Sequence, residues 1–144
     1  VLNPAPAIEL PKSLLELTDI IIPNETEAEL LTGISINNES DMKETATYFL
    51  DLGISAVLIT LGEQGTYCAY QEQYKMIPAC NVKAIDTTAA GDTFIGAFLS
   101  ELNKDLSNIE SAIRLANQAS SLTVQRKGAQ ASIPTRKEVE AEYN

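Results

Sequence analysis

Short apolar runs alternate with longer amphipathic segments along most of this sequence, and this alternation constrains the fold more than any other feature. The runs 19–23 and 55–60 are rich in β-branched residues, and 55–60 (SAVLIT) is apolar almost throughout. Such a run is typical of a strand buried on both faces of a sheet. The segments 38–52, 89–102 and 108–125 instead repeat apolar residues with the period of a helix. We therefore expect strands and helices to alternate, as they do in α/β proteins.

Further local signals complete the predicted order of elements. Asn24 is suited to cap a helix that carries acidic residues in its first turn and ends at Gly33. Residues 66–70 and 74–78 are predicted to form an antiparallel pair, 82–85 a further short strand, and the last residues a short helix. We predict a parallel-sheet, three-layer α/β/α sandwich with an antiparallel margin. Ligands of such sheets bind at the carboxyl ends of the strands.

The charge and the residue types exclude several classes of function. The chain has 10 basic and 20 acidic residues, and its net charge of −10 would repel a nucleic acid. It has no His and only two Cys, without a Cys-x-x-Cys pair, which excludes the usual zinc ligand sets, and the lack of His excludes a Ser-His-Asp triad and a His general base. No apolar run has the length of a membrane span. We expect a cytoplasmic protein whose partners are neither nucleic acids nor membranes.

The segment 86–93 (DTTAAGDT) is the sharpest of three polar or glycine-rich clusters that follow predicted strands. Its small residues Ala89, Ala90 and Gly91 open a predicted helix, so their N–H groups would point outward and the helix dipole would favour a phosphate. Asp92 lies in the same turn and is suited to accept the proton of an attacking hydroxyl, as in phosphoryl transfer. An ordinary turn before a helix with an acidic first turn explains the same pattern, so spacing alone leaves both interpretations open.

Three further segments each have a functional and a purely structural interpretation. Asn24 and Glu27 are suited to hold a metal-bound water or a phosphate, but they also suit a helix cap. The loop 60–65 is suited to lie against a nucleotide, or it only connects a strand to the hairpin. The segment 126–132 offers backbone carbonyls and one hydroxyl that suit a monovalent cation, or it is an ordinary loop after a helix. Without further context, the structural interpretation explains each segment well.

Taken together, these segments resemble the ribokinase-like (PfkB) family of sugar kinases. The segment 86–94 is similar to the family's second signature, 23–27 (PNETE) to its Asn-x-x-Glu motif, and 60–65 (TLGEQG) to its nucleotide loop. Residues 3–7 (NPAPA) and 126–130 (RKGAQ) look like the members that phosphorylate ribose. Many members have Gly where Ala89 stands, but Ala is usual in the ribose kinases. The motifs occur in order over nearly the whole chain, so the resemblance is specific.

The resemblance implies a reaction and a role for each motif. The reaction would transfer the γ-phosphoryl group of ATP to the 5-hydroxyl of D-ribose, giving D-ribose 5-phosphate and ADP. Asp92 would be the catalytic base, and the anion hole would consist of the amides of Ala89, Ala90, Gly91 and Asp92. Glu27 would act on Mg²⁺ through water, and the nucleotide would be bound by Asn24, Glu27, Thr60, Gly62, Gly65 and Asn117. A potassium ion would be held, in several cases by backbone carbonyls, at Asp86, Thr88, Thr123, Arg126, Gly128 and Ser132.

The resemblance also implies that the family fold extends beyond these residues. Family members are longer, and their N-terminal half supplies the lid strands and most of the sugar-binding residues. We therefore expect residues 1–144 to form a single nucleotide-binding and catalytic region, the C-terminal part of a larger kinase domain that is homodimeric at full length. The alternatives are another sugar or nucleoside kinase of the family, such as a fructokinase-like enzyme, or a non-catalytic nucleotide-binding module.

Overall fold

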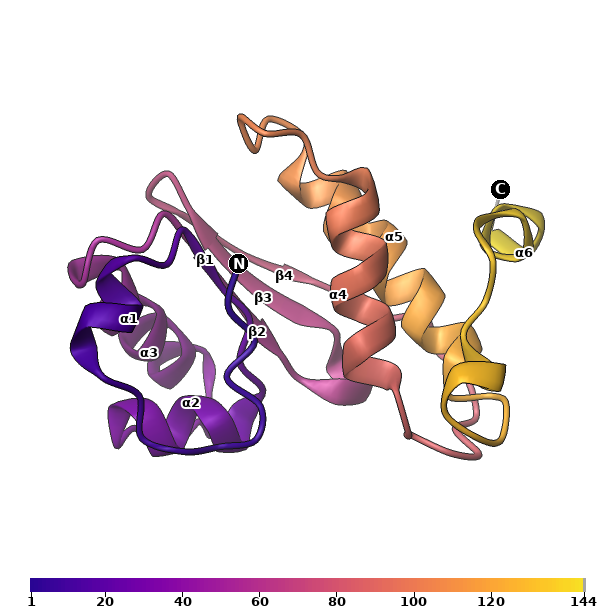
Figure 1. Cartoon of the computed structure of the whole chain (residues 1–144), viewed down its shortest axis with the longest axis horizontal. Helices are drawn as coiled ribbons and strands as arrows, with labels where there is room; N and C mark the ends of the chain where they lie inside the picture. Colours follow the sequence, from indigo (N-terminus) through magenta and orange to yellow (C-terminus); the bar gives the residue numbers. More distant parts are fainter. Residues whose placement is uncertain (144) are drawn as a thin grey trace. The chain divides into compact units, whose positions relative to one another are not determined.

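Four strands form one sheet, in the order β1-β2-β3-β4, in the computed structural model, which describes residues 1–143 (Figure 1). The chain divides into two compact units, which are unit 1 (Val1–Gly62 and Thr66–Met76) and unit 2 (Glu63–Gly65 and Ile77–Asn144). The elements follow along the chain as α1 (Lys12–Glu16), β1 (Ile20–Ile21), α2 (Glu25–Thr32), α3 (Glu39–Asp51), β2 (Ala56–Thr60), η1 (Gly62–Gln64), β3 (Thr66–Tyr70), β4 (Gln73–Ile77), α4 (Ala90–Glu101), α5 (Ile109–Thr123), η2 (Gln130–Ser132) and α6 (Arg136–Tyr143).

Strand β2 is the buried centre of the pairing in unit 1. Its first residue, Ala56, lies opposite Ile20 of the parallel strand β1 and opposite Tyr70 of the antiparallel strand β3. Because β2 has a neighbour on each side, its apolar run is almost entirely buried, as predicted. The hairpin from β3 to β4 turns at Gln71 and Glu72, which both have positive φ angles (50° and 61°). Such angles belong to the tight turns that match the twist of paired strands.

Helix α3 supplies much of the hydrophobic core of unit 1. Phe49 of α3 is completely buried and belongs to one cluster with Val57 and Ile59 of β2 and Tyr67 of β3. Burying a large apolar side chain of this kind contributes roughly 1.5–3 kcal/mol. The apolar residues of the predicted helix 38–52 therefore point where the amphipathic pattern indicates, toward the sheet of their own unit.

Helices α4 and α5 form the core of unit 2. The rings of Phe94 and Phe98 in α4 are stacked, with 6.3 Å between their centroids, and both residues are buried. Ile113 of α5 is completely buried, and Val139 of α6 joins a second cluster with Leu122 at the far end of α5. In the described part of the chain, no helix combines the length and apolar character needed to cross a membrane.

The structure corrects one prediction and confirms the α/β class. Residues 82–85 do not form a strand, because the amides of Ile85 and Asp86 donate to the carbonyl of Val124 (2.7 and 3.1 Å) and not to a neighbouring strand. Ile85 is 60% exposed, so this short run does not bury the apolar face that a core strand needs. The sheet is mixed, as the predicted antiparallel margin implies, since β2 pairs in parallel with β1 and antiparallel with β3.

Candidate functional site

The first turn of α4 has the geometry of an anion site. Ala89, which precedes it, adopts a left-handed conformation with φ of 62°. The amide of Ala90 donates to the carbonyl of Thr87 (3.2 Å), and the first helical hydrogen bond runs from the amide of Thr93 to the carbonyl of Ala89 (2.9 Å). The amides of Gly91 and Asp92 therefore lie at the helix start, where N–H groups have no helical acceptor and favour an anion.

Asp92 lies in this first turn and its side chain is exposed. It also lines a pocket of about 310 Å³ in unit 2, formed by α4, α5, α6 and the segment that leads into α6. A carboxylate in this position is accessible to a hydroxyl group, and it lies beside the amides that would hold a phosphate. The arrangement can therefore accept a proton and stabilise negative charge within a single turn of helix.

Two side chains of α5 hold the inner side of this turn. The hydroxyl of Ser120 donates to the carbonyl of Ala90 (2.7 Å), and the hydroxyl of Thr123 donates to that of Thr93 (3.1 Å). Thr93 and Thr123 are both buried, at 4% and 0% exposure. Hydrogen bonds from α5 therefore hold this turn at Ala90, before Asp92 in the sequence, and at Thr93, after it.

Asp86 joins the loop before α4 to the loop after α5. Its two carboxylate oxygens accept the amides of Thr88 (2.9 Å) and Gly128 (3.0 Å). Hydrogen bonds from the Thr88 side chain and from these two amides lower the pKa of Asp86 from 3.8 to about 2. The carboxylate therefore stays ionised over the physiological range and remains an oxygen donor of full negative charge.

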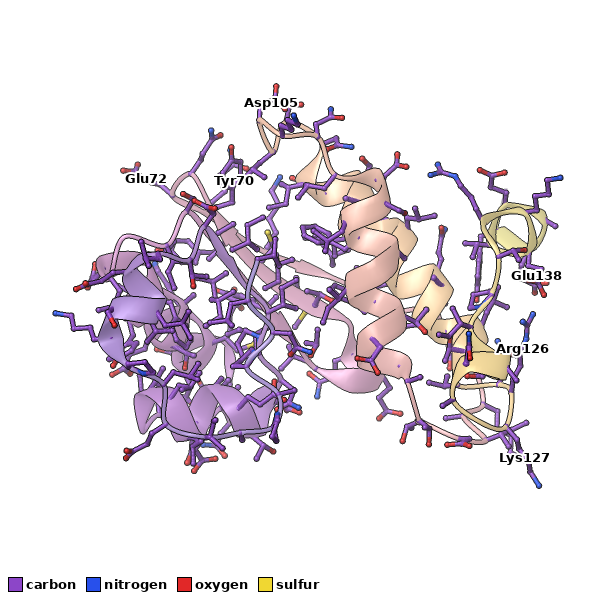
Figure 2. All side chains as sticks on the ribbon, in the orientation of Figure 1. Tyr70, Glu72, Asp105, Arg126, Lys127 and Glu138 are labelled. Atoms are coloured by element: carbon purple, nitrogen blue, oxygen red, sulfur yellow. The ribbon has the colours of Figure 1, made fainter. Side chains whose placement is uncertain are left out.

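The remaining residues predicted for the potassium ion have different surroundings. Ser132 is buried, and its hydroxyl donates a hydrogen bond to the carbonyl of Ala129 (2.6 Å), a bond that does not use the lone pairs of the hydroxyl oxygen. The carbonyl of Thr123 accepts the amide of Arg126 (3.0 Å). The Arg126 side chain pairs with Glu138 at 2.8 Å (Figure 2). Because a guanidinium is itself a cation without acceptor atoms, only the backbone carbonyl of Arg126 is suited to a cation. Within residues 1–143, no group of three or more His, Cys, Asp and Glu side chains is placed to hold a metal ion.

Asn24 and Glu27 form a reciprocal capping box at the start of α2. The Asn24 side chain accepts the amide of Glu27 (2.9 Å), and a Glu27 carboxylate oxygen accepts the amide of Asn24 (2.8 Å). Asn24 also forms an isolated parallel bridge with Thr60, whose amide donates to the carbonyl of Pro23 (2.9 Å). Three residues predicted to bind the nucleotide, Asn24, Glu27 and Thr60, therefore lie together at one end of β2. Asn24 and Glu27 also form the helix cap that the structural interpretation predicted.

The two predicted nucleotide-loop glycines differ in their surroundings. Both have positive φ angles, 56° at Gly62 and 111° at Gly65. A Cβ atom on Gly62 would meet open space, whereas one on Gly65 would overlap the carbonyl oxygen of Ile77 and lie 2.6 Å from the amide nitrogen of Ala79. The close approach of two backbone segments explains why glycine is needed at position 65.

Asn117, predicted to lie beside the adenine, is 5% exposed in α5. Its side-chain amide donates to the carbonyls of Ile77 (3.1 Å) and Pro78 (3.2 Å), at the end of β4. Gly65 also lies close to the backbone of Ile77 and Pro78. Asn117 therefore holds the backbone that adjoins the predicted nucleotide loop.

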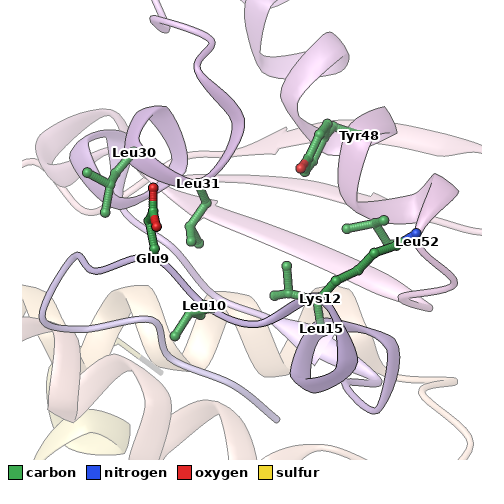
Figure 3. A pocket seen from close by; sticks show the side chains of 8 residues that line it. All are labelled: Glu9, Leu10, Lys12, Leu15, Leu30, Leu31, Tyr48 and Leu52. Carbon is green, nitrogen blue, oxygen red and sulfur yellow. The ribbon is translucent and has the colours of Figure 1, made fainter.

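A second pocket, of about 480 Å³, lies in unit 1 (Figure 3). Leucines and Tyr48 form most of its lining, with Glu9 and Lys12 at its polar positions. None of the predicted site residues lines it. Its volume exceeds that of the pocket beside Asp92, but its chemistry gives no reason to place the reaction there.

The predicted site residues divide between the two units. Unit 1 contains Asn24, Glu27, Thr60 and Gly62, and unit 2 contains the residues predicted for the anion hole, the base, the cation and the adenine, together with Gly65. The residue that sequence reasoning missed is Ser120. Its signal was weak, because the pair Ser120-Ser121 near the C-terminal end of a predicted helix does not reveal which hydroxyl bonds outside its own helix.

The chain is similar to known carbohydrate kinases over most of its length. Residues 1–136 match the family described as pfkB family carbohydrate kinase. A ribokinase of Staphylococcus aureus (strain COL) is 65% identical over 139 residues, which cover 96% of this chain and 46% of that protein. A solved ribokinase structure from Thermotoga maritima has a TM-score of 0.86 at 38% identity, covering 96% of this chain and 46% of that one. The structure of an Arabidopsis thaliana ribokinase complexed with ribose and ATP has a TM-score of 0.84 at 34% identity, covering 94% and 44%.

The chain spans about half the length of the relatives that it matches. The family match nevertheless contains all the motifs that the sequence predicted to be functional, from Asn24 to Ser132. The helix start with its free amides and acidic side chain lies within this match as well. The match extends over nearly the whole chain, and from it we conclude that the chain belongs to the pfkB family of carbohydrate kinases.

Proposed function

We propose that the protein containing this chain transfers the γ-phosphoryl group of ATP to the 5-hydroxyl of D-ribose, giving D-ribose 5-phosphate and ADP. The observation that carries the proposal is the first turn of α4, where the amides of Gly91 and Asp92 precede the first helical hydrogen bond and the Asp92 carboxylate is exposed beside them. The 65% identity to a ribokinase supports ribose as the acceptor.

In the proposed reaction Asp92 acts as the general base. Its carboxylate accepts the proton of the ribose 5-hydroxyl while that oxygen forms a bond to the γ-phosphorus and the bond from the γ-phosphorus to the ADP oxygen breaks. The anion hole consists of the first-turn amides, from Ala89 to Asp92. These donors stabilise the negative charge on the γ-phosphoryl oxygens in the transition state. Of the four, the Ala90 amide is already used by Thr87, so Gly91 and Asp92 supply the most accessible N–H groups.

We assign the nucleotide contacts to Thr60, Gly62, Gly65 and Asn117, with Asn24 and Glu27 near the phosphates. Mg²⁺ would neutralise charge on the phosphates, as it does in phosphoryl transfer generally. The residues fit a water-mediated role, because the capping box uses only one carboxylate oxygen of Glu27. The second oxygen of Glu27 would then accept a hydrogen bond from a metal-bound water.

We further propose that K⁺ binds among the oxygen donors around Asp86. The donor set consists of one ionised carboxylate, the buried hydroxyl of Ser132 and backbone carbonyls from the segments at Thr88, Thr123, Arg126 and Gly128. Hard oxygen donors of this kind suit an alkali metal cation. A bound cation would fix the two loops that Asp86 already connects, and the loop that holds Asp86 leads directly into α4.

The remaining features of the proposal concern the whole protein. We propose that residues 1–144 act as one nucleotide-binding and catalytic region within a cytoplasmic homodimeric kinase. Its partners would be small molecules, ribose and ATP. The net charge of −10 supports the absence of a nucleic-acid partner, since a polyanion would be repelled.

The test is a steady-state assay of ADP formation by the full-length protein, with and without D-ribose. The variant Asp92→Asn keeps the shape of the side chain but cannot accept the proton, so kcat should fall by about 10²- to 10⁴-fold. Asp51→Asn is the matched control, because Asp51 is also an exposed helical carboxylate and none of the proposed roles involves it. The control should retain the wild-type kcat.

Two outcomes would contradict the proposal. A near-wild-type kcat in Asp92→Asn would remove Asp92 from the role of base. A panel of ribose, 2-deoxyribose, fructose and a nucleoside tests the acceptor, and faster turnover of any of the last three would overturn ribose as the substrate. Binding of ATP with no turnover of any acceptor would favour the nucleotide-binding module.

A further inference from the structure

Ser120 makes the shortest side-chain hydrogen bond between α5 and the start of α4. Its hydroxyl lies 2.7 Å from the carbonyl oxygen of Ala90, a residue 30 positions earlier and two before Asp92. Ser120 is half-buried and lies near the C-terminal end of α5. The bond therefore connects one rigid helix to the first residue of another, and it acts on the turn that carries the proposed base.

The direction of this hydrogen bond is unusual for a serine in a helix. Serine and threonine in a helix commonly donate to the carbonyl four residues earlier. The neighbouring Ser121 does so, donating to the carbonyl of Asn117 (2.8 Å). Ser120 instead donates away from its own helix, so its bond has a tertiary consequence that the bond of Ser121 lacks.

The turn held by Ser120 is one that needs external support. Ala89 has a left-handed φ of 62°, which is unfavourable for a residue with a Cβ atom. Such conformations persist where the surrounding structure holds them, and they concentrate at functional sites. The contact from Ser120 falls on the very next residue, and the bond between Thr123 and Thr93 holds the turn three residues further on.

We infer that Ser120 is a positioning residue that sets the place of the Gly91 and Asp92 amides and of the Asp92 carboxylate. Ser120 acts through its hydrogen bond to the Ala90 carbonyl, which holds the first residue of α4 against α5. The inference rests on the proposed kinase function, and it adds to that function a residue outside the motifs that the sequence singled out. Loss of the hydroxyl would let the first turn shift while the rest of α4 stays packed by Phe94 and Phe98.

The test compares Ser120→Ala with Ser121→Ala in the full-length protein. Both variants remove one hydroxyl from adjacent positions of the same helix, but only the first loses a bond to α4. In Ser120→Ala we expect kcat to fall by about 10- to 100-fold, since small misplacements of reacting groups are costly. KM for ATP should change much less. Ser121→Ala should keep its kcat, and Ser120→Thr should recover most of the activity because it restores the donor.

A second measurement keeps the inference separate from the proposed reaction. The amide of Thr93, which makes the first helical hydrogen bond, should exchange its hydrogen faster in Ser120→Ala than in Ser121→Ala, whatever the protein phosphorylates. A wild-type protein with no kinase activity would refute the proposed function, and the exchange result would still decide whether Ser120 holds the turn. Equal kcat values and equal exchange in the two alanine variants would overturn the role of Ser120. A fall in kcat that Ser120→Thr does not rescue would also count against it.

Discussion

Replacing Gly65 by alanine tests whether backbone contact, and not loop flexibility, explains the glycines of the predicted nucleotide loop. Gly65 and Gly62 lie three residues apart and both have positive φ angles. At Gly65 an added Cβ would overlap the backbone of Ile77 and lie 2.6 Å from the amide nitrogen of Ala79, whereas at Gly62 it would meet open space. Gly62→Ala is therefore a matched control for the strain that alanine suffers at a positive φ.

The expected difference follows from these two environments. At Gly62, φ of 56° lies in the left-handed region, where an L-residue costs roughly 1–2 kcal/mol. At Gly65, φ of 111° falls where residues other than glycine are rarer still, and we estimate about 1–3 kcal/mol for the strain. The overlap with fixed backbone adds about 1–3 kcal/mol, because Ile77 and Ala79 must move. Gly65→Ala should thus lower the free energy of unfolding by about 1–4 kcal/mol more than Gly62→Ala does.

Urea unfolding followed by circular dichroism measures this difference. With an m value of about 2 kcal/mol/M, the midpoint of Gly65→Ala should lie about 0.5–2 M below that of Gly62→Ala. KM for ATP should also rise in Gly65→Ala, since the shifted backbone carries the proposed nucleotide loop. Equal midpoints for the two variants would refute the close-contact reasoning, and a lower midpoint for Gly62→Ala would reverse it.

Two further predictions concern side chains that join distant parts of unit 2. Asp86 has its pKa lowered from 3.8 to about 2, so its stabilising effect is fully present above about pH 4 and is lost as the pH falls through 2. Wild type should therefore be more stable than Asp86→Asn at pH 5, and the gap in unfolding midpoints should shrink by pH 2, whereas a constant gap would exclude this linkage. Asn117→Ala leaves two carbonyls at the end of β4 without their donor. The substitution should lower the free energy of unfolding by about 1–3 kcal/mol and raise KM for ATP more than it lowers kcat. An unchanged thermal unfolding midpoint would argue against a stabilising role of the Asn117 hydrogen bonds.

Local features of the fold were predictable because their causes lie within a few residues. The capping box joins Asn24 and Glu27 across three positions, so a sequence pattern is enough to recognise it. The apolar run that became β2 identifies a buried strand by composition alone. The predicted helix over 38–52 appears as Glu39–Asp51, since its amphipathic period and its Asn38 cap are also local.

The failed prediction of a strand over 82–85 has its physical cause in competition for backbone hydrogen bonds. Residues 82–85 have a strand-like pattern, but the amide of Ile85 bonds to Val124, which is 39 positions later. No local signal specifies that acceptor. The register of β2 with β1 and β3 likewise depends on which strands meet and not on the composition of any one strand.

The sequence by itself determined the family, the start of α4 and the position of Asp92 in its first turn, because these depend on short motifs and local helix signals. Only the tertiary structure decided which polar side chains support that turn. Ser120 and Ser121 are identical in type and adjacent in sequence, yet one bonds to α4 and the other to its own helix. A hydrogen bond is specified within a few tenths of an ångström, and its partner 30 residues away depends on how two helices pack. That packing sets the side of α5 that faces α4, and with it the difference between the two serines.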